Sequence, residues 1–266
     1  ELHERTRAFG IRRLKKEVMA ELPDKIRQIV YVEPTVKEKR EYNNVQRSWM
    51  SEYQMHKSSG SLPAGFVLNM LTELRHHCGI LKVNATVNWV KEYHEMTGKP
   101  IIVFAHHKDV VASVIEDLQD VMTVGRITGE VSAEKRQERV EAFQAGKIDV
   151  MVCSTVAAKE GLTLTAADTV VFVEREWTPA WEEQAEDRVN RIGQDAKTVH
   201  AVYLSVAGTI DEKFNTVVEE KREIIQSILD GGDVVERQGL AKALLQSMVD
   251  AGELPADLIR DIGVGE

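Results

Sequence analysis

The chain has 266 residues, and 43% of them are hydrophobic, so it can bury the core of one large domain or of one domain with appendages. It carries 43 acidic and 34 basic residues, and the net charge of -9 argues against a surface wholly devoted to nucleic acid. Because it has no run of about 18 apolar residues and its first residues lack a signal peptide's apolar segment, we expect an intracellular protein that does not enter a membrane.

The first part of the chain is expected to be mainly helical. Pro34 and Thr35 open one helix, the composition of residues 58–63 is typical of a loop, and Gly98 followed by Lys99-Pro100 ends the last helix. The expected elements, in chain order, are a basic helix, a strand and three further helices at 1–22, 26–33, 35–57, 66–78 and 83–96.

From residue 99 the pattern changes to strands that alternate with helices. Strands are expected at 101–105, 124–127, 149–153, 169–173 and 199–204. Helices are expected at 108–118, 132–145, 179–192 and 210–229. Strand, helix, strand is the pattern of right-handed βαβ units, so this block predicts an open parallel sheet with helices on both faces.

Polar residues follow these expected strands. They are His106, His107, Lys108, Thr128, Gly129, Ser154, Thr155, Glu174 and Arg175. Ligands of open parallel sheets bind at the carboxyl ends of the strands. The sequence therefore predicts a binding site at this edge of the sheet.

The expected helix 179–192 carries Gln184, Arg188 and Arg191 at positions i, i+4 and i+7. At about 100° per residue these three side chains would share one face of a helix. Two guanidinium groups on one face need an anionic partner, and guanidinium matches phosphate bidentately. For two arginines on any helix, a solvated face paired with Glu183 and Asp187 is the more common interpretation.

The full string from Gln184 to Gln194 (Gln-Ala-Glu-Asp-Arg-Val-Asn-Arg-Ile-Gly-Gln) resembles motif VI of SNF2-family ATPases. The string from Ile101 to Lys108 (Ile-Ile-Val-Phe-Ala-His-His-Lys) resembles their motif IV, in the form found in the annealing-helicase-like branch. Other segments that resemble this family in the expected order are 9–25 and 71–75, 127–129 with Arg136 and Phe143, 154–170 (motif V) and 177–179.

This resemblance implies the fold, the activity and the site residues. The fold would be α/β, a RecA-like parallel sheet with flanking helices, a helical insert and a helical C-terminal tail. ATP and Mg²⁺ would lie between two such lobes, and duplex or branched DNA would be the partner. The implied catalytic residues are Arg188, Arg191 and Gln184; the nucleotide-binding residues are Glu160, Gly161 and Leu162; the DNA-binding residues are His106, Lys108, Thr128, Gly129, Ser154, Thr155 and Lys159.

Residues 156–162 depart from the family pattern, because Val-Ala-Ala-Lys-Glu-Gly-Leu stands where Arg-Ala-Gly-Gly-Leu-Gly is common. Gly161 is kept, and we expect it to need left-handed backbone or a close approach. Thr178 replaces the usual Asn, and it can cap its helix equally well.

The sequence lacks one element that an ATPase needs. It contains no Gly-x-x-x-x-Gly-Lys-Ser/Thr motif, whose backbone cradles phosphates and places magnesium. We therefore expect a piece of a longer protein that is inactive as an ATPase without a first RecA-like lobe. The expected domains are an exit segment of that first lobe with its linker (1–45), a helical insert (46–98), the RecA-like domain (99–230) and an acidic helical tail (231–266).

Two alternatives stay open. An RNA-directed helicase would share the fold, although DEAD-box proteins have Arg in place of Gln194. A non-catalytic RecA-like module that binds nucleic acid or protein would not need two arginines at these positions. No metal site is predicted, because Cys78 and Cys153 form no CxxC motif and the histidine pairs His76-His77 and His106-His107 lack metal-ligand spacing.

Overall fold

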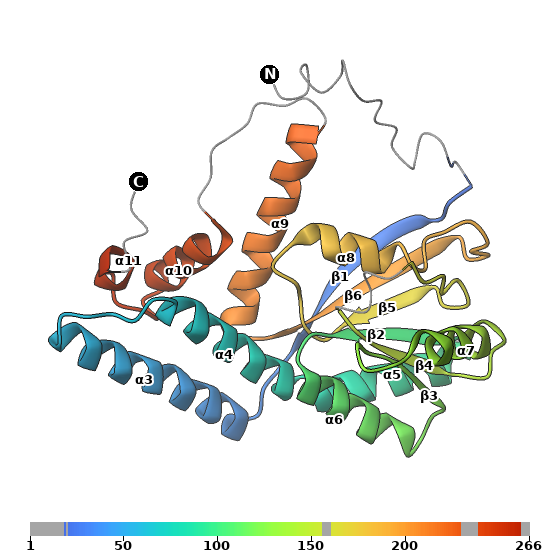
Figure 1. Cartoon of the computed structure of the whole chain (residues 1–266), viewed down its shortest axis with the longest axis horizontal. Coiled ribbons are helices and arrows are strands. Elements are labelled where there is room, and N and C mark those ends of the chain that lie inside the picture. The colour runs from blue at the N-terminus through green and yellow to red at the C-terminus, as the bar shows by residue number, and fades with distance from the viewer. Residues whose placement is uncertain (1–18, 20, 156–160, 230–238, 262–266) are drawn as a thin grey trace. The chain divides into compact units, whose positions relative to one another are not determined.

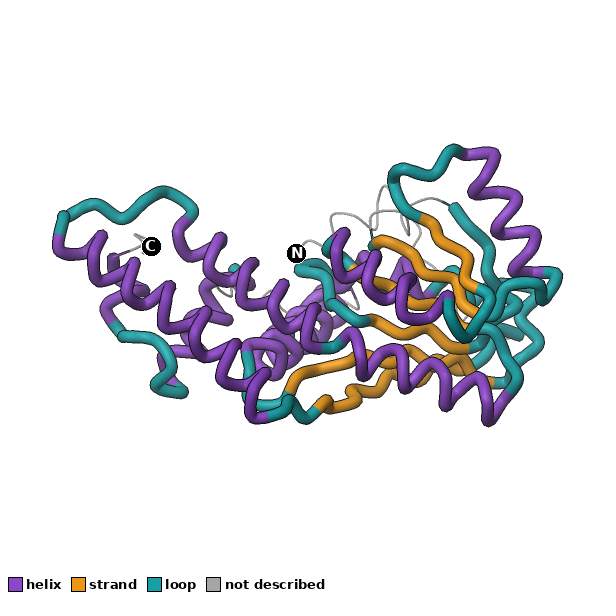
Figure 2. Tube along the Cα trace, turned by 90° about the horizontal axis from the view of Figure 1, so that it is seen from below, coloured by secondary structure: helices purple, strands orange, loops and turns teal. Residues whose placement is uncertain are grey.

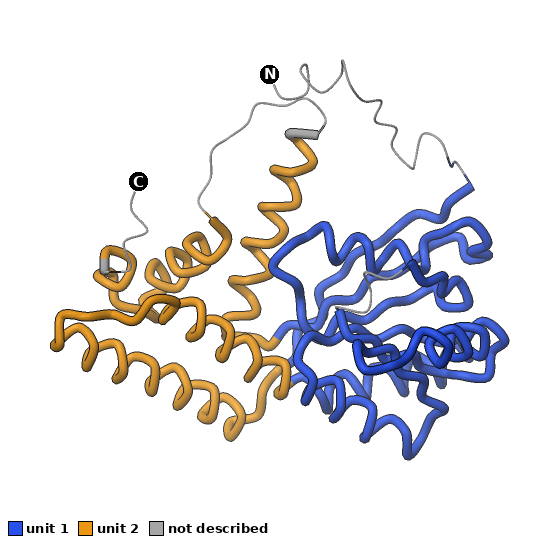
Figure 3. Tube along the Cα trace, viewed as in Figure 1, with its two compact units in different colours: residues 1–32, 82–205 blue, residues 33–81, 206–266 orange. Residues whose placement is uncertain are grey.

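The computed structural model describes residues 19, 21–155, 161–229 and 239–261. The chain divides into two compact units (Figure 3). Unit 1 comprises residues 1–32 and 82–205, and unit 2 comprises residues 33–81 and 206–266. The boundaries of these compact units differ from those of the domains expected from the sequence. The expected functional domains stay a prediction.

A six-stranded sheet forms the centre of unit 1 (Figure 1). Its order is β1-β6-β5-β2-β4-β3, and the pairs among β2 to β6 are parallel. The strands are β1 (Asp24–Val32), β2 (Ile101–Ala105), β3 (Val124–Ile127), β4 (Val150–Ser154), β5 (Thr169–Phe172) and β6 (Thr198–Val206). The N–H of Asp24 donates to the carbonyl of Lys197 at 3.3 Å, so β1 and β6 begin at the same edge. The expected parallel sheet is therefore confirmed, with β1 as an added edge strand.

Helices cover both faces of this sheet (Figures 1 and 2). Ile102 and Phe104 pack with residues of α7 (Ala133–Gln144) and α8 (Pro179–Glu186). The alternate residues of β2 pack with α5 (Val83–Thr97) and α6 (Lys108–Gln119). Since side chains alternate between the two faces of a strand, a strand covered on both sides must be apolar throughout. This explains why every residue of β2 is buried.

Several helix ends follow the local signals of the sequence, but the Thr178 side chain forms no capping hydrogen bond at the start of α8. The Ser132 side chain accepts from the N–H of Lys135 and caps α7, as expected. Gly98 ends α5 with a left-handed φ of 65°, and Gly146 follows α7 with a φ of 69°. Thr35 and Glu38 form a capping box at the start of α3 (Val36–Ser58). These boundaries needed no tertiary contact to be predicted.

Unit 2 is helical. Its elements are α3, α4 (Phe66–Leu81), α9 (Ile210–Leu229), α10 (Leu240–Asp250) and α11 (Asp257–Asp261). Helix α4 packs against α3 and α9, and the Arg75 guanidinium lies 3.9 Å from the centre of the Phe214 ring. Leu244, Leu245 and Met248 of α10 are buried, so the apolar side of this helix belongs to the core of this unit. Among the described helices, none is both long and apolar enough to cross a bilayer.

Candidate functional site

The sheet brings together polar residues that follow β2, β4 and β5. The ring nitrogen Nδ1 of His106 lies 3.2 Å from Oγ1 of Thr155 and 2.8 Å from Oε1 of Glu176. His106 follows β2, Thr155 follows β4, and Glu176 lies beyond the end of β5. Two residues expected to bind DNA are thus neighbours at the carboxyl edge, because the parallel strands end there together.

Glu174 occupies the N-terminus of α6. Its Oε2 accepts from the N–H groups of His106 at 2.8 Å and His107 at 2.9 Å, and its Oε1 lies 2.5 Å from Nδ1 of His107. Burial by itself would raise the pKa of Glu174, but the contacts with His107 outweigh it and lower the pKa to about 2. A carboxylate of this chain therefore binds the two backbone N–H groups that directly precede α6, at the positive end of its dipole.

Replacing Glu174 with glutamine should destabilise unit 1 by about 1.5–3 kcal/mol at pH 7, because hydrogen bonds to a buried charge are lost. The folded pKa of Glu174 lies below the ordinary 4.5. The charge therefore stabilises the fold above about pH 4.5, and this contribution disappears as the pH falls to about 2. Urea unfolding at pH 7 and pH 3 checks this expectation.

Glu130→Gln is the control for this experiment. Glu130 is exposed and pairs only with Lys108 among the contacts described, so its replacement should leave the urea midpoint unchanged. If Glu174→Gln costs the same at pH 3 as at pH 7, the charge of Glu174 does not stabilise the α6 N-terminus.

Four of the other residues expected to contact DNA lie at the carboxyl edge, on or just after three different elements. Lys108 is 90% exposed, and its Nζ bonds to Oε1 of Glu130 at 2.9 Å. Thr128 and Gly129 follow β3, and Ser154 is the last residue of β4. Lys159 and the nucleotide-binding candidate Glu160 lie outside the described residues.

The two candidate catalytic arginines contact the segment that resembles motif V. Nη1 of Arg191 donates to Oγ1 of Thr163 at 2.9 Å and to the carbonyl of Leu162 at 3.3 Å. The N–H of Leu164 donates to the carbonyl of Arg188 at 3.0 Å. Burial lowers the pKa of Arg188, and the charge of Arg191 lowers it further. The positive charge of Arg191 thus disfavours the charged form of Arg188, as a neighbouring like charge does.

The helix expected to carry these arginines ends early. We expected it to continue to Ile192, but α8 ends at Glu186, and Arg188 and Arg191 lie in the turns beyond it. The prediction that Arg188 and Arg191 share a helix face with Gln184 is therefore wrong. Gln184 is exposed on α8 itself. Tertiary contacts end the helix here. The N–H of Leu164 donates to the carbonyl of Arg188, and the Gln194 side chain donates to the carbonyls of Ala167 and Val189.

Gly161 does not have the backbone geometry that we expected. Its φ lies outside the left-handed region, and a Cβ built on it would meet no described atom within 4 Å. Within the described chain, neither backbone strain nor a close approach requires a glycine here. Leu162 beside it is half-buried and packs against the sheet core.

Buried acids of α8 are functional candidates that sequence reasoning missed. Arg175 forms a two-point ion pair with Glu182, with Nε–Oε1 at 2.9 Å and Nη2–Oε2 at 2.6 Å. Glu186 accepts from Lys25, Arg27 and the Tyr203 hydroxyl, and its side chain is fully buried. The spacing of Glu182 and Glu186 on one helix face was visible, but an acidic stripe usually faces solvent, so it gave no signal of burial.

The described residues contain no group of three or more His, Cys, Asp or Glu side chains that could hold a metal ion. Asp168, in the segment that resembles motif V, lies at the other edge of the sheet. It immediately precedes β5, where Nζ of Lys99 at 2.5 Å and the hydroxyl of Tyr93 at 2.7 Å donate to it. Asp168 therefore supports the sheet away from the candidate site.

Two family models match the sequence: the helicase conserved C-terminal domain at residues 82–193 and the SNF2-related domain at residues 1–83. The human protein named DNA annealing helicase and endonuclease ZRANB3 is 33% identical over 233 residues, which are 87% of this chain and 21% of that protein. The chain thus spans about a fifth of the length of curated relatives that it matches.

Two solved structures share the fold. The C-terminal part of the Fun30 ATPase domain matches with a TM-score of 0.66 at 16% identity, over 87% of this chain and 99% of that one. The Sulfolobus solfataricus SWI2/SNF2 ATPase core in complex with dsDNA matches with a TM-score of 0.64 at 23% identity, over 98% of this chain and 55% of that one. The expected RecA-like fold is therefore confirmed.

Proposed function

Because this chain belongs to the SNF2 family and carries its C-terminal helicase lobe, we propose that it works in an ATP-dependent translocase that moves along DNA. The observation that carries this proposal is the arginine pair. Arg188 is buried, and Arg191 contacts Thr163 and Leu162, so the turn beyond α8 holds both arginines against the segment that resembles motif V.

Arg191 is the residue that we assign to the transferring γ-phosphoryl group. A preorganised guanidinium stabilises the charge that spreads over the phosphoryl oxygens in the transition state. Arg188 keeps a positive charge beside it, and exposed Gln184 orients the attacking water or the arginines. Glu160, Gly161 and Leu162 would contact the nucleotide from the adjoining segment, which Arg191 holds through Leu162 and Thr163.

The carboxyl edge of the sheet would hold one strand of duplex DNA. His106, Lys108 and Thr155 there offer a ring, a cation and a hydroxyl, all of which can bond to phosphate oxygens. Such contacts carry little sequence information, as a translocase requires. Closing and opening against a second RecA-like lobe during each ATP cycle would then move the chain along the duplex.

The experiment that tests this function compares ATP turnover of the complete protein with duplex DNA and with RNA of equal length. Duplex DNA should stimulate turnover strongly, and RNA should have little effect. Stimulation by RNA alone would point instead to an RNA-directed helicase. A protein that hydrolyses no ATP under either condition would be a binding module.

The 266 residues by themselves should hydrolyse no ATP, because they contain no P-loop to cradle the phosphates and place Mg²⁺. Phosphate release from the purified chain, with and without duplex DNA, measures this. A cooperative thermal transition of the same sample shows that it is folded. Turnover that co-purifies with the folded chain would contradict the need for a P-loop-bearing lobe.

A further inference from the structure

Most charges of helix α3 lie on two opposite sides, although Lys37 lies beside Glu41 on the acidic side. Lys39, Arg40, Asn43 and Arg47 fall within about 100° of arc at 100° per residue. We call these four residues the α3 basic stripe. The acidic residues of the same helix, Glu38, Glu41 and Glu52, fall within about 60° on the opposite side.

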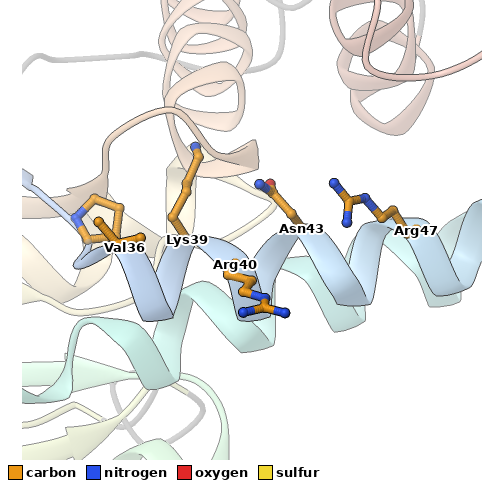
Figure 4. A pocket seen from close by; sticks show the side chains of 6 residues that line it. Val36, Lys39, Arg40, Asn43 and Arg47 are labelled. Carbon is orange, nitrogen blue, oxygen red and sulfur yellow. The ribbon is translucent and has the colours of Figure 1, made fainter.

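A hollow of about 420 Å³ lies along the α3 basic stripe (Figure 4). Pro34 and Val36 complete its lining, which contains no carboxylate. In Figure 4, the Lys39, Asn43 and Arg47 side chains project from the same side of the helix, and the Arg40 side chain lies across its front. The hollow is therefore lined by three cations, an amide and a small apolar end.

No described carboxylate neutralises the charges of the two arginines of the stripe. Arg40 and Arg47 are exposed, and neither forms an ion pair with a described residue. Lys39 differs, because its Nζ donates to the carbonyl of Gly208 and lies 5.9 Å from the centre of the Tyr42 ring. Lys39 is thus anchored at one end of the hollow, while both guanidinium groups are available to an anionic partner.

A second hollow, of about 300 Å³, continues along α3 and shares Asn43 and Arg47 with the first. Its lining includes one acid, Glu253, whose Oε1 lies 2.5 Å from Nζ of Lys213. That pairing offsets the negative charge of Glu253. The two hollows together give an elongated surface, which suits a linear anion better than a small, enclosed one.

We propose that the α3 basic stripe binds the phosphate backbone of DNA, in addition to the carboxyl edge of the sheet. Arg40 and Arg47 are seven residues apart, which is about 10 Å along a helix and close to three nucleotide steps of about 3.4 Å. Guanidinium groups bind phosphate bidentately. With a net charge of -9, the chain as a whole repels DNA, so a local cationic surface determines where the backbone can approach. This inference rests on the proposed function.

The test measures the affinity of the complete protein for a fluorescent duplex at several salt concentrations. Arg40→Gln with Arg47→Gln should reduce the magnitude of the slope of log K against log salt by about 2, because about 0.9 is lost for each phosphate contact. Affinity at about 0.1 M salt should fall roughly ten- to a hundredfold. Arg40→Lys with Arg47→Lys keeps both charges and should keep the slope.

The control removes two other exposed cations, through Lys147→Gln with Lys197→Gln. These precede β4 and β6, at the amino edge of the sheet, and should leave the slope unchanged. If the wild type binds DNA and the arginine double variant has the same slope, the stripe does not bind DNA, and the proposed function still stands. An α3 basic stripe that binds an acidic protein would give this same result. Failure of the wild-type protein to bind DNA overturns the proposed function itself.

Discussion

Arg191→Ala should lower DNA-stimulated ATP turnover of the complete protein by about three orders of magnitude or more, the range measured for arginine fingers. The reason is electrostatic. Thr163 and Leu162 hold the Arg191 guanidinium in place, and alanine removes the positive charge that we assign to the transition state. The charge matters mainly in the transition state, so ATP binding should change little. Steady-state phosphate release and equilibrium binding of a fluorescent ATP analogue measure the two effects separately.

Two further variants sharpen this result. Arg191→Lys keeps the charge but loses the planar fork, so it should recover only part of the turnover. Arg139→Ala is the matched control, because Arg139 also donates to a backbone carbonyl, that of Arg126 at 2.6 Å, on a different part of unit 1. Turnover near the wild-type value in Arg191→Ala would refute the assignment of Arg191 to the phosphoryl group.

Glu186→Ala should destabilise unit 1 by about 3–5 kcal/mol, the usual effect of removing one partner from a buried ionic network. The fully buried carboxylate bonds to Nζ of Lys25 at 2.8 Å, Nε of Arg27 at 2.7 Å and the hydroxyl of Tyr203 at 2.5 Å. Without it, two cations of β1 face each other beside the sheet with less compensation. Urea unfolding at pH 7 measures the loss.

The effect of Glu186 should also depend on pH. Burial by itself would raise the pKa of Glu186, but Arg27 and Lys25 outweigh it and lower the pKa to about 2. A depressed pKa stabilises the fold above the ordinary value of 4.5, and this stabilisation is lost as the pH falls to about 2. The difference between the wild type and Glu186→Gln should therefore be constant near neutral pH and shrink between pH 4.5 and 2.

Glu183→Ala is the control for this network. Glu183 lies one turn from Glu186 and only 3.9 Å from Arg27, but its side chain is 48% exposed. Its replacement should change stability by no more than about 0.5 kcal/mol. If Glu186→Ala and Glu183→Ala lower the free energy of unfolding equally, the burial of Glu186 does not strengthen its ion pairs.

The turn beyond α8 shows where local periodicity gave the wrong geometry. Helical spacing predicted that Arg188 and Arg191 share one helix face, but the chain leaves the helix after Glu186 and bonds to residues 162–164 and to Ala167. The roles of the two arginines stay a prediction, which the Arg191→Ala variant tests.

The sequence by itself determined the parallel sheet, the exact limits of two strands and several helix caps. Ile101–Ala105 and Val124–Ile127 were predicted to the residue, because apolar runs and the stops that flank them are local properties. Only the tertiary structure decided that Glu174 would occupy the start of α6 and that Glu186 would join Lys25 and Arg27. These partners are 67 to 161 residues apart in the chain, and they meet only because the strand crossovers bring them to one side of the sheet.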